Sequence, residues 1–274
     1  MSNKTLPFVI AALALVLAPR AAQAQEIQLT GPLAGAPAVR NLRLHREGRI
    51  EIAPTLAFTL LDEYRRTVFA GARVQYNVTD WLGVGVWGAF GALQLDTDLS
   101  EKIDKNAPRA LAQTQSNLRS SDFPKQVSSM QWVAAPQVQL VPFRGKIAMF
   151  EKVFVDTDAY IHVGVAAVGL KERGDCKGAA ACSLPASFDL QSRVALAPTF
   201  GLGLNFYTSD HISLGVEYRA MPFSWNRAGF DTRGTGTDGN SPDGNVDAQD
   251  RTFKFNQMVA VSVGILLGDR KVTE

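Results

Sequence analysis

Oxygen-bearing side chains recur at short intervals around glycines in one stretch near the end of the chain. The candidate ligands are Asp238, Asn240, Asp243, Asn245 and Asp247, with Asp250 just beyond them. Hard cations such as Ca²⁺ prefer carboxylate and amide oxygens spaced in this way. The stretch is not an EF-hand, because the glutamate at the twelfth position is missing and Pro242 intervenes. The pattern therefore leaves two interpretations open, a calcium-stabilised loop and a plain polar loop, and no other cofactor is expected.

Charged and amide side chains also occur singly within apolar stretches, at alternate positions. This set comprises Glu51, Arg73, Gln75, Gln137, Gln139, His162, Glu217 and Arg219. If they share one interior, their opposite charges can form ion pairs that fill it, and a gated conduction path is the alternative. A hydrolase site would need a serine and a carboxylate beside His162. The sequence gives no sign of that grouping, so we expect no enzyme activity and assign no catalytic residue.

The elements that position these residues are predicted to be strands, because apolar residues recur with a period of two. The clearest stretch is 194–225, VALAPTFGLGLNFYTSDHISLGVEYRAMPFSW. Its even-numbered positions are mostly apolar, and its odd-numbered positions are mostly small or polar. Thr208, Ser209 and Asp210 supply turn residues between the two halves, so the stretch predicts a β-hairpin.

The apolar face of these strands is predicted to meet lipid. A soluble ligand-binding barrel would turn that face inward, and its other face would need charge for solubility. The other face carries mainly Gly, Ala, Ser, Thr, Gln and Asn, which suits the inside of a narrow barrel. Placing Arg73 or Arg219 in lipid near the midplane would instead cost roughly 2 to 4 kcal/mol each.

The whole chain predicts an eight-stranded antiparallel up-and-down transmembrane β-barrel, an all-β fold. The strands are expected at 49–60, 67–78, 82–95, 130–141, about 158–170, in the two halves of 194–225, and at 253–268. Connections after the second, fourth and sixth strands are mostly short, and those after the third, fifth and seventh are long. That asymmetry is typical of short periplasmic turns and long external loops. We also expect a β-bulge near 88–91, a short helix within 108–118, and a short amphipathic helix at 146–155.

The N-terminus predicts export. Residues 1–24 combine Lys4, an apolar run and a small-x-small ending, as in a cleaved signal peptide. A periplasmic extension, 25–48, the barrel, 49–268, and a tail, 269–274, complete the predicted organisation. Cleavage removes Lys4 and Arg20 but no acid, so 28 basic residues become 26 and match the 26 acidic ones. That balance argues against a nucleic-acid partner.

Cys176 and Cys182 lie in the long stretch that follows the fifth predicted strand. In an exported chain their simplest role is a disulfide, which would stabilise the loop by roughly 2 to 3 kcal/mol. A redox or metal-binding pair is the alternative. Against that alternative, the spacing of Cys176 and Cys182 differs from C-x-x-C, and no histidine accompanies the two cysteines.

Five segments together resemble the myxobacterial-type outer-membrane β-barrel domain family, across most of residues 26–268. They are GRIEIAPTLAFTLLDEYRRT, VQYNVTDWLGVGVWGAFG, PFRGKIAMF, NRAGFDTRG and FNQMVAVSVGILL. The resemblance implies an outer-membrane barrel without catalytic residues, of a kind that in some cases belongs to gliding-motility or envelope assemblies. One departure is the ending GDRKVTE, where many outer-membrane proteins carry a terminal aromatic residue that the insertion machinery reads.

The predicted function is structural. We expect an integral barrel of the cell outer membrane that anchors or binds partners in the envelope, with membrane lipid and other envelope proteins as its partners. The alternatives are a narrow porin-like channel for ions or small solutes, and the barrel component of a gliding-motility or envelope complex. A soluble secreted carrier is a third class, and it would be recovered without detergent.

Overall fold

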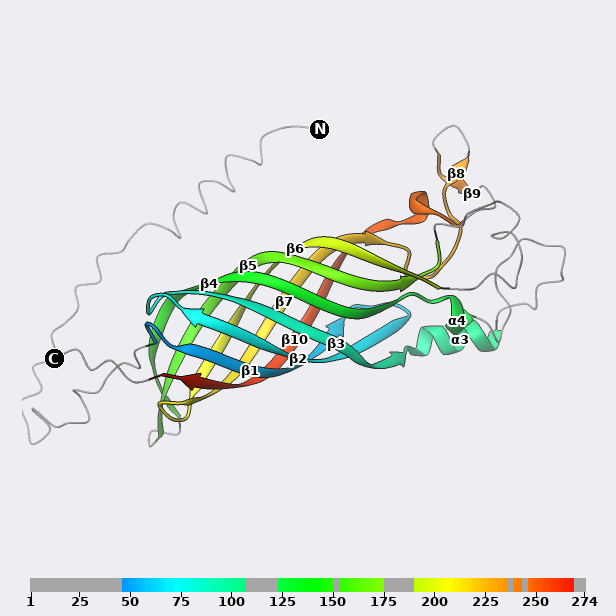
Figure 1. Ribbon diagram of the computed structural model, residues 1–274. Helices are drawn as coiled ribbons and strands as arrows, with labels where there is room; N and C mark the ends of the chain where they lie inside the picture. Colours follow the sequence, from blue (N-terminus) through cyan, green and yellow to red (C-terminus); the bar gives the residue numbers. More distant parts are fainter. Residues whose placement is uncertain are drawn as a thin grey trace, which may run out of the picture. The chain divides into compact units, whose positions relative to one another are not determined.

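Eight long strands close into one antiparallel barrel, which confirms the predicted fold class. A computed structural model describes residues 46–106, 123–149, 153–174, 190–235, 239–242 and 246–268. The order of neighbouring strands around the barrel is β1-β10-β7-β6-β5-β4-β3-β2 (Figure 1). The strands are β1 Ile50–Leu60, β2 Arg65–Asn77, β3 Leu82–Asp96, β4 Ser129–Met149, β5 Val153–Glu172, β6 Gln191–Tyr207, β7 Ile212–Trp225 and β10 Thr252–Leu267.

The predictions for the signal peptide, for most of the N-terminal extension, for the helix within 108–118 and for the C-terminal tail concern residues outside those ranges. No helix in the described part of the chain is both long enough and apolar enough to cross a membrane.

The alternation of apolar and small or polar residues along the sequence matches the alternation of exposed and buried residues in the barrel. In β1, and in β6 from Val194 onward, every second residue is buried inside, and the residues between them face outward. The outward set includes Ile50, Ile52, Leu56, Val74, Val84, Val86, Val138, Leu140, Ile161, Val163, Leu202, Leu214, Val216, Val261 and Ile265, all exposed. The barrel wall therefore presents branched apolar side chains to its surroundings.

The hairpin of β4 and β5 is longer than predicted and contains no helix in its described part. Residues 146–149 continue β4, and β5 begins at Val153, with Met149 paired to Val153. The prediction of an amphipathic helix at 146–155 was therefore wrong. Strand pairing satisfies the backbone of both segments, and it overrides the helical spacing of their apolar residues.

The predicted phase change in β3 occurs slightly later than expected. Val68 of β2 pairs with Leu93, whereas Phe69 pairs with Gly91, so Ala92 is the extra residue of a bulge. The bulge moves the outward parity from even to odd positions. This is why Val86 and Leu93 both face outward although their parities differ.

The two ends of the barrel differ in what closes them (Figure 1). One end carries the connections 61–64, 97–128, 173–190 and 226–251, and we call it the loop end. Its short elements are α3 Asp98–Asn106, α4 Phe123–Gln126, the small sheet of β8 Gly234–Thr235 with β9 Ser241–Pro242, and the 3₁₀ turn η1 Ala248–Asp250. The other end, which we call the terminus end, carries the tight turns at 78–81 and 208–211 and both ends of the barrel sequence.

The interior is divided along the barrel axis. Its half toward the loop end holds one cluster of apolar side chains that pack against one another, which we call the apolar chamber. The cluster consists of Ala57, Phe69, Trp87, Ala89, Met130, Val133, Ala135, Ala166, Val168, Leu170, Ala195, Ala197, Met221, Phe223, Trp225, Met258 and Ala260. The half toward the terminus end holds mainly polar side chains. The sequence analysis expected small or polar residues throughout and missed this apolar chamber.

Candidate functional site

All eight polar residues predicted to share an interior lie inside the barrel. The side chains of Glu51, Arg73, Gln75, Gln137, Gln139, His162, Glu217 and Arg219 are all buried. They come from five strands, β1, β2, β4, β5 and β7. Closing the sheet brings these strands around one axis, so residues far apart in the sequence meet near the middle of the barrel.

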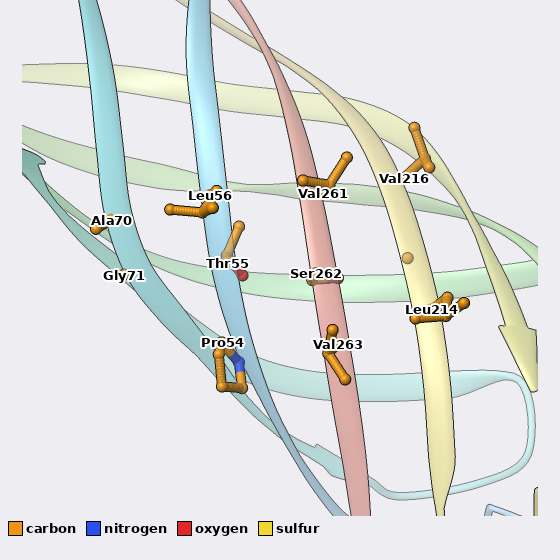
Figure 2. Close-up of a pocket in the computed structure, with 11 residues that line it drawn as sticks. Pro54, Thr55, Leu56, Ala70, Gly71, Leu214, Val216, Val261, Ser262 and Val263 are labelled. Atoms are coloured by element: carbon orange, nitrogen blue, oxygen red, sulfur yellow. The ribbon is translucent and has the colours of Figure 1, made fainter. Parts of the chain in front are cut away.

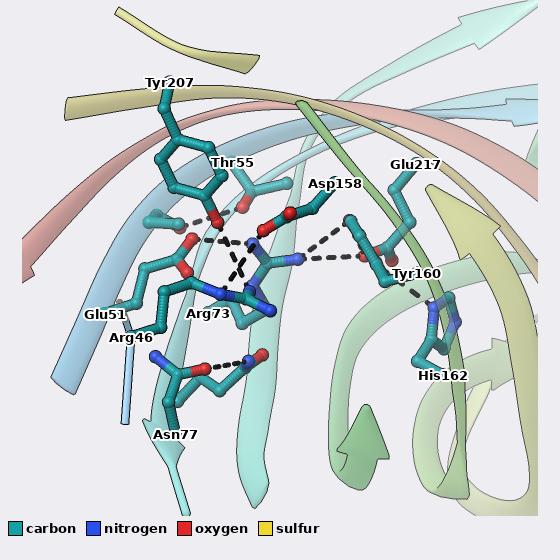
Figure 3. A network of polar contacts seen from close by, with 12 residues as sticks. Arg46, Glu51, Thr55, Arg73, Asn77, Asp158, Tyr160, His162, Tyr207 and Glu217 are labelled. Carbon is teal, nitrogen blue, oxygen red and sulfur yellow. Dashed lines mark hydrogen bonds and ion pairs between the residues drawn. The ribbon is translucent and has the colours of Figure 1, made fainter. Parts of the chain in front are cut away.

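Glu217 lies at the centre of this group, between two arginines. Its Oε1 accepts hydrogen bonds from Arg219 Nε at 3.0 Å and Nη2 at 2.7 Å. Its Oε2 accepts hydrogen bonds from Arg73 Nη1 at 3.2 Å and from the Tyr160 hydroxyl at 2.9 Å. Arg73 in turn donates from Nη2 to Glu51 Oε1 at 2.8 Å (Figure 3). Two arginines and two glutamates thus form a cluster whose formal charges cancel.

Arg219 extends the cluster across the barrel. Its guanidinium lies 4.5 Å from the centroid of the Trp87 ring. It also donates to Gln137 Oε1 at 2.7 Å and to Thr199 Oγ1 at 3.1 Å. The planar guanidinium can make these contacts together because its donors point in several fixed directions. The side chain spans from β7 to β3 and β4, and it separates the polar half of the interior from the apolar chamber.

Tyr160 is a member of the cluster that the sequence analysis missed. Its hydroxyl accepts a hydrogen bond from Arg73 Nη1 at 2.9 Å, and its ring centroid lies 5.3 Å from the Arg73 guanidinium carbon. Tyr160 has the same strand parity as His162, which was predicted to point inward. That parity is the signal that could have identified Tyr160.

Glycines of the neighbouring strand make room for these large side chains. A Cβ on Gly203 would overlap the ring of Tyr160, whereas a Cβ on Gly145 would meet nothing within 4 Å. We expect Gly203→Ala to destabilise the barrel by about 1 to 3 kcal/mol, the usual cost of overpacking. Gly145→Ala is the matched control and should change the unfolding free energy little. Urea unfolding in lipid vesicles measures both, and equal stability of the two variants would contradict the close packing of Tyr160 on Gly203.

Several buried polar atoms in the described interior have no hydrogen-bond partner from the protein. They include both ring nitrogens of His162, both side-chain polar atoms of Gln139 and both of Asn205. His162 Nδ1 lies 3.8 Å from Glu217 Oε2, which is beyond hydrogen-bond distance. Within the described chain, His162 therefore lacks the hydrogen-bonded serine and carboxylate that a hydrolase would require.

The terminus end is closed by side chains that precede β1. Arg46 is 1% exposed, and its Nε lies 3.3 Å from Asp158 Oδ2, while its backbone N–H donates to Asp80 Oδ1 at 2.7 Å. Arg49 donates from Nη2 to the carbonyl of Asp210 at 2.8 Å. Arg46 falls within 25–48, which the sequence analysis predicted to be a periplasmic extension. Its burial was not predictable, because its partners come from distant turns and strands.

The loop end is closed by the connections between strands. Ser128 donates its backbone N–H to the Arg227 carbonyl at 2.9 Å, and the Phe123 and Phe230 rings stack at 5.9 Å. Arg227 Nη2 lies 3.2 Å from Asp62 Oδ1. Burial raises the pKa of the Asp62 carboxyl, although hydrogen bonding to Thr59 and the charge of Arg227 oppose the rise. Contacts between the described segments, polar at the terminus end and both polar and aromatic at the loop end, thus cover both ends of the lumen.

The predicted calcium loop is described only in part. Asp238, Asp243 and Asn245 lie outside the described residues, and so do Cys176 and Cys182. Asp247 Oδ1 accepts the backbone N–H of Gln249 at 2.7 Å. Asp250 Oδ1 accepts the backbone N–H groups of Thr232 at 2.6 Å and Arg233 at 3.0 Å. These two carboxylates therefore order the loop backbone, and the calcium site and the disulfide remain predictions.

The outer wall carries a shallow groove of about 570 Å³ across β2, β1, β10 and β7. Figure 2 shows its apolar lining, which includes Leu56, Leu214 and Val263. The pairing of β1 with β10 passes from Ile52↔Ile265 directly to Thr55↔Ser262, so the ladder is interrupted beside Pro54. The groove belongs to the apolar outer face, and no polar side chain of the interior cluster lines it.

No family model matches the chain, and no curated protein matches its sequence. Solved structures do resemble it. The N-terminal β-barrel domain of Pseudomonas aeruginosa OprF is 8% identical, with a TM-score of 0.42, over 81% of this chain and 98% of that one. The outer membrane protein OprG from Pseudomonas aeruginosa is 11% identical, with a TM-score of 0.37, over 82% and 98%. Ail of Yersinia pestis is 10% identical, with a TM-score of 0.33, over 81% and 99%.

The similar structures are mostly outer-membrane barrels, and they include one protease. The outer membrane protease OmpT from Escherichia coli is 6% identical, with a TM-score of 0.24. Identities and scores this low carry no inference about activity. The architecture of this chain is established by its own strand pairing, and its resemblance to the myxobacterial-type family remains an expectation.

Proposed function

We propose that this chain is an integral β-barrel of the outer membrane with a structural, anchoring or partner-binding role in the cell envelope. The observation that carries the proposal is the combination of an apolar outer wall with an interior closed at three levels. The central ion pairs fill the middle, Arg46 and Arg49 cover the terminus end, and the 123–128 and 226–230 segments cover the loop end. Such a barrel anchors its loops in the membrane but leaves no wide path through it.

The connections at the loop end are the part of the protein that would bind partners. They are long, and hydrogen bonds within and between their described parts hold them, as the contacts of Asp250 with Thr232 and of Ser128 with Asn226 show. Binding residues are often placed on loops held by a rigid scaffold. Long external loops also fit the barrel component of an envelope or gliding-motility assembly, a role that some barrels of the resembled family have.

A narrow channel is the second candidate, and the polar half of the interior favours it. Gln139, His162 and Asn205 have buried polar atoms that the described protein does not satisfy, and such groups ordinarily bind ordered water. A continuous water path through the barrel would require three rearrangements: of the Glu217 cluster, of Arg46 and Arg49 at the terminus end, and of the segments that cover the loop end.

Fractionation and conductance separate these roles. We expect the protein in the outer-membrane fraction, extracted by detergent, and we expect no discrete openings when the purified protein is added to planar bilayers. Recovery in the soluble fraction would contradict the membrane assignment. Discrete openings that vanish in Arg73→Ala or Glu217→Ala would establish the channel in place of the closed anchor. A pull-down in detergent from envelope extracts would then identify the partner.

A further inference from the structure

One seam of the barrel wall lacks strand pairing over its half toward the loop end. The pairing of β6 with β7 ends at Phe200↔Ala220, although β6 continues to Gln191 and β7 to Trp225. Beyond that point β6 pairs only with β5, and β7 pairs only with β10. The backbones of residues 191–199 and 221–225 therefore do not pair with each other.

Two prolines stand where the ladder stops. Continuing the register from Phe200↔Ala220 would place Pro198 opposite Pro222. Neither residue has a backbone N–H, so neither can donate a ladder hydrogen bond. The sequence thus prevents regular pairing at this height, and the strands can separate toward the loop end.

Polar contacts of Arg193 and Glu172, which we call the latch, connect β6 and β7 where this seam reaches the loop end. Arg193 of β6 donates from Nη2 to the Ser224 carbonyl of β7 at 3.0 Å and also pairs with Glu172. Glu172 accepts the Arg251 Nε at 2.8 Å and the backbone N–H of Asn226 at 3.4 Å. The side-chain contact to Ser224 takes the place of a backbone hydrogen bond between the strands.

Both sides of the seam are apolar. Outside, Val194 is 56% exposed and Leu196 is 74% exposed. Inside lies the apolar chamber, with Ala195 and Ala197 on β6 and Met221 and Phe223 on β7. The chamber also contains Met130, Met221 and Met258, three of the five methionines of the chain, and methionine adapts its shape readily.

We propose that the β6–β7 seam is a lateral entrance through which the acyl chain of a membrane lipid reaches the apolar chamber. The proposal rests on the proposed function, because only a barrel embedded in a bilayer has acyl chains at this wall. A hydrocarbon chain needs no hydrogen bonds and can pass between the unpaired strands. The ion-pair cluster around Arg219 bounds the chamber on the side of the terminus end. The acyl chain therefore enters through the wall and does not extend into the polar half of the interior.

The test uses tryptophan quenching by phosphatidylcholine brominated in its acyl chains. Trp225 faces the chamber, so a protein with Trp81, Trp87 and Trp132 replaced by Phe reports on it alone. We expect its quenching to fall at least twofold in the Pro198→Thr/Pro222→Thr variant, which restores two donors to the seam. We expect it to rise in Arg193→Ala, which loses the latch.

A second protein that keeps only Trp132 provides the control. Trp132 lies on the outward parity of β4, away from the seam, and it should be quenched equally in all three backgrounds. Equal quenching of Trp225 in the parent protein, in Pro198→Thr/Pro222→Thr and in Arg193→Ala would overturn the lateral entrance but not the membrane barrel. Absence of Trp132 quenching in folded, vesicle-bound protein would instead overturn the lipid-facing wall and the proposed function with it.

Discussion

Replacing Glu217 by Ala is expected to destabilise the barrel by about 3 to 5 kcal/mol, the usual cost of removing one partner from a buried ion pair. Glu217 is shared by Arg73 and Arg219, both of which are buried. Without the carboxylate, two guanidinium groups would remain in the interior with only Glu51 to balance them. Urea unfolding in lipid vesicles, followed by tryptophan fluorescence, measures the change in free energy.

Two comparisons make this result specific. Glu101→Ala removes an equal charge from an exposed pair with Lys105 on α3, and it should change the stability little. Glu217→Gln keeps the shape and one acceptor oxygen, so its loss should fall between the two. If Glu217→Ala were no less stable than Glu101→Ala, the cluster would not be a structural element of the barrel.

Replacing Leu202 by Arg should oppose insertion into a bilayer by roughly 2 to 4 kcal/mol, the cost of an arginine on the lipid face near the midplane. Leu202 is 60% exposed and faces outward on β6. It pairs with Tyr218, between Glu217 and Arg219, and so lies at the height of the ion-pair cluster. Folding yield in vesicles, scored by the mobility of unheated protein on gels, measures the effect.

The control for this substitution lies on α3, outside the barrel wall. Leu99 is also exposed, but Leu99→Arg should leave insertion unchanged because it stands in a connection at the loop end. A Leu202→Arg protein that inserts as well as the Leu99→Arg protein would show that water, and not hydrocarbon, contacts this side of β6. The outer-membrane assignment would then fail.

The strands and their faces were predictable because a strand reports its environment locally. Each residue between Val194 and Phe206 faces either the outside of the barrel or its interior, and the two sides accept different side chains. The same local reasoning predicted a phase change in β3 near 88–91, close to the bulge at Ala92, because a single extra residue inverts the parity that follows. It failed at 146–155, because a short apolar run fits both the helical and the strand period. There the pairing of Met149 with Val153 decides in favour of the strand.

The sequence by itself determined that Glu217 and Arg219 point inward, since both share the polar parity of β7. It did not determine what they contact. Only the closed barrel brings Arg73 and Tyr160 to Glu217, places Arg46 over the terminus end, and gathers distant methionines into an apolar chamber. The physical reason is that alternation depends on neighbours along one strand, whereas these contacts depend on register and closure around the whole sheet.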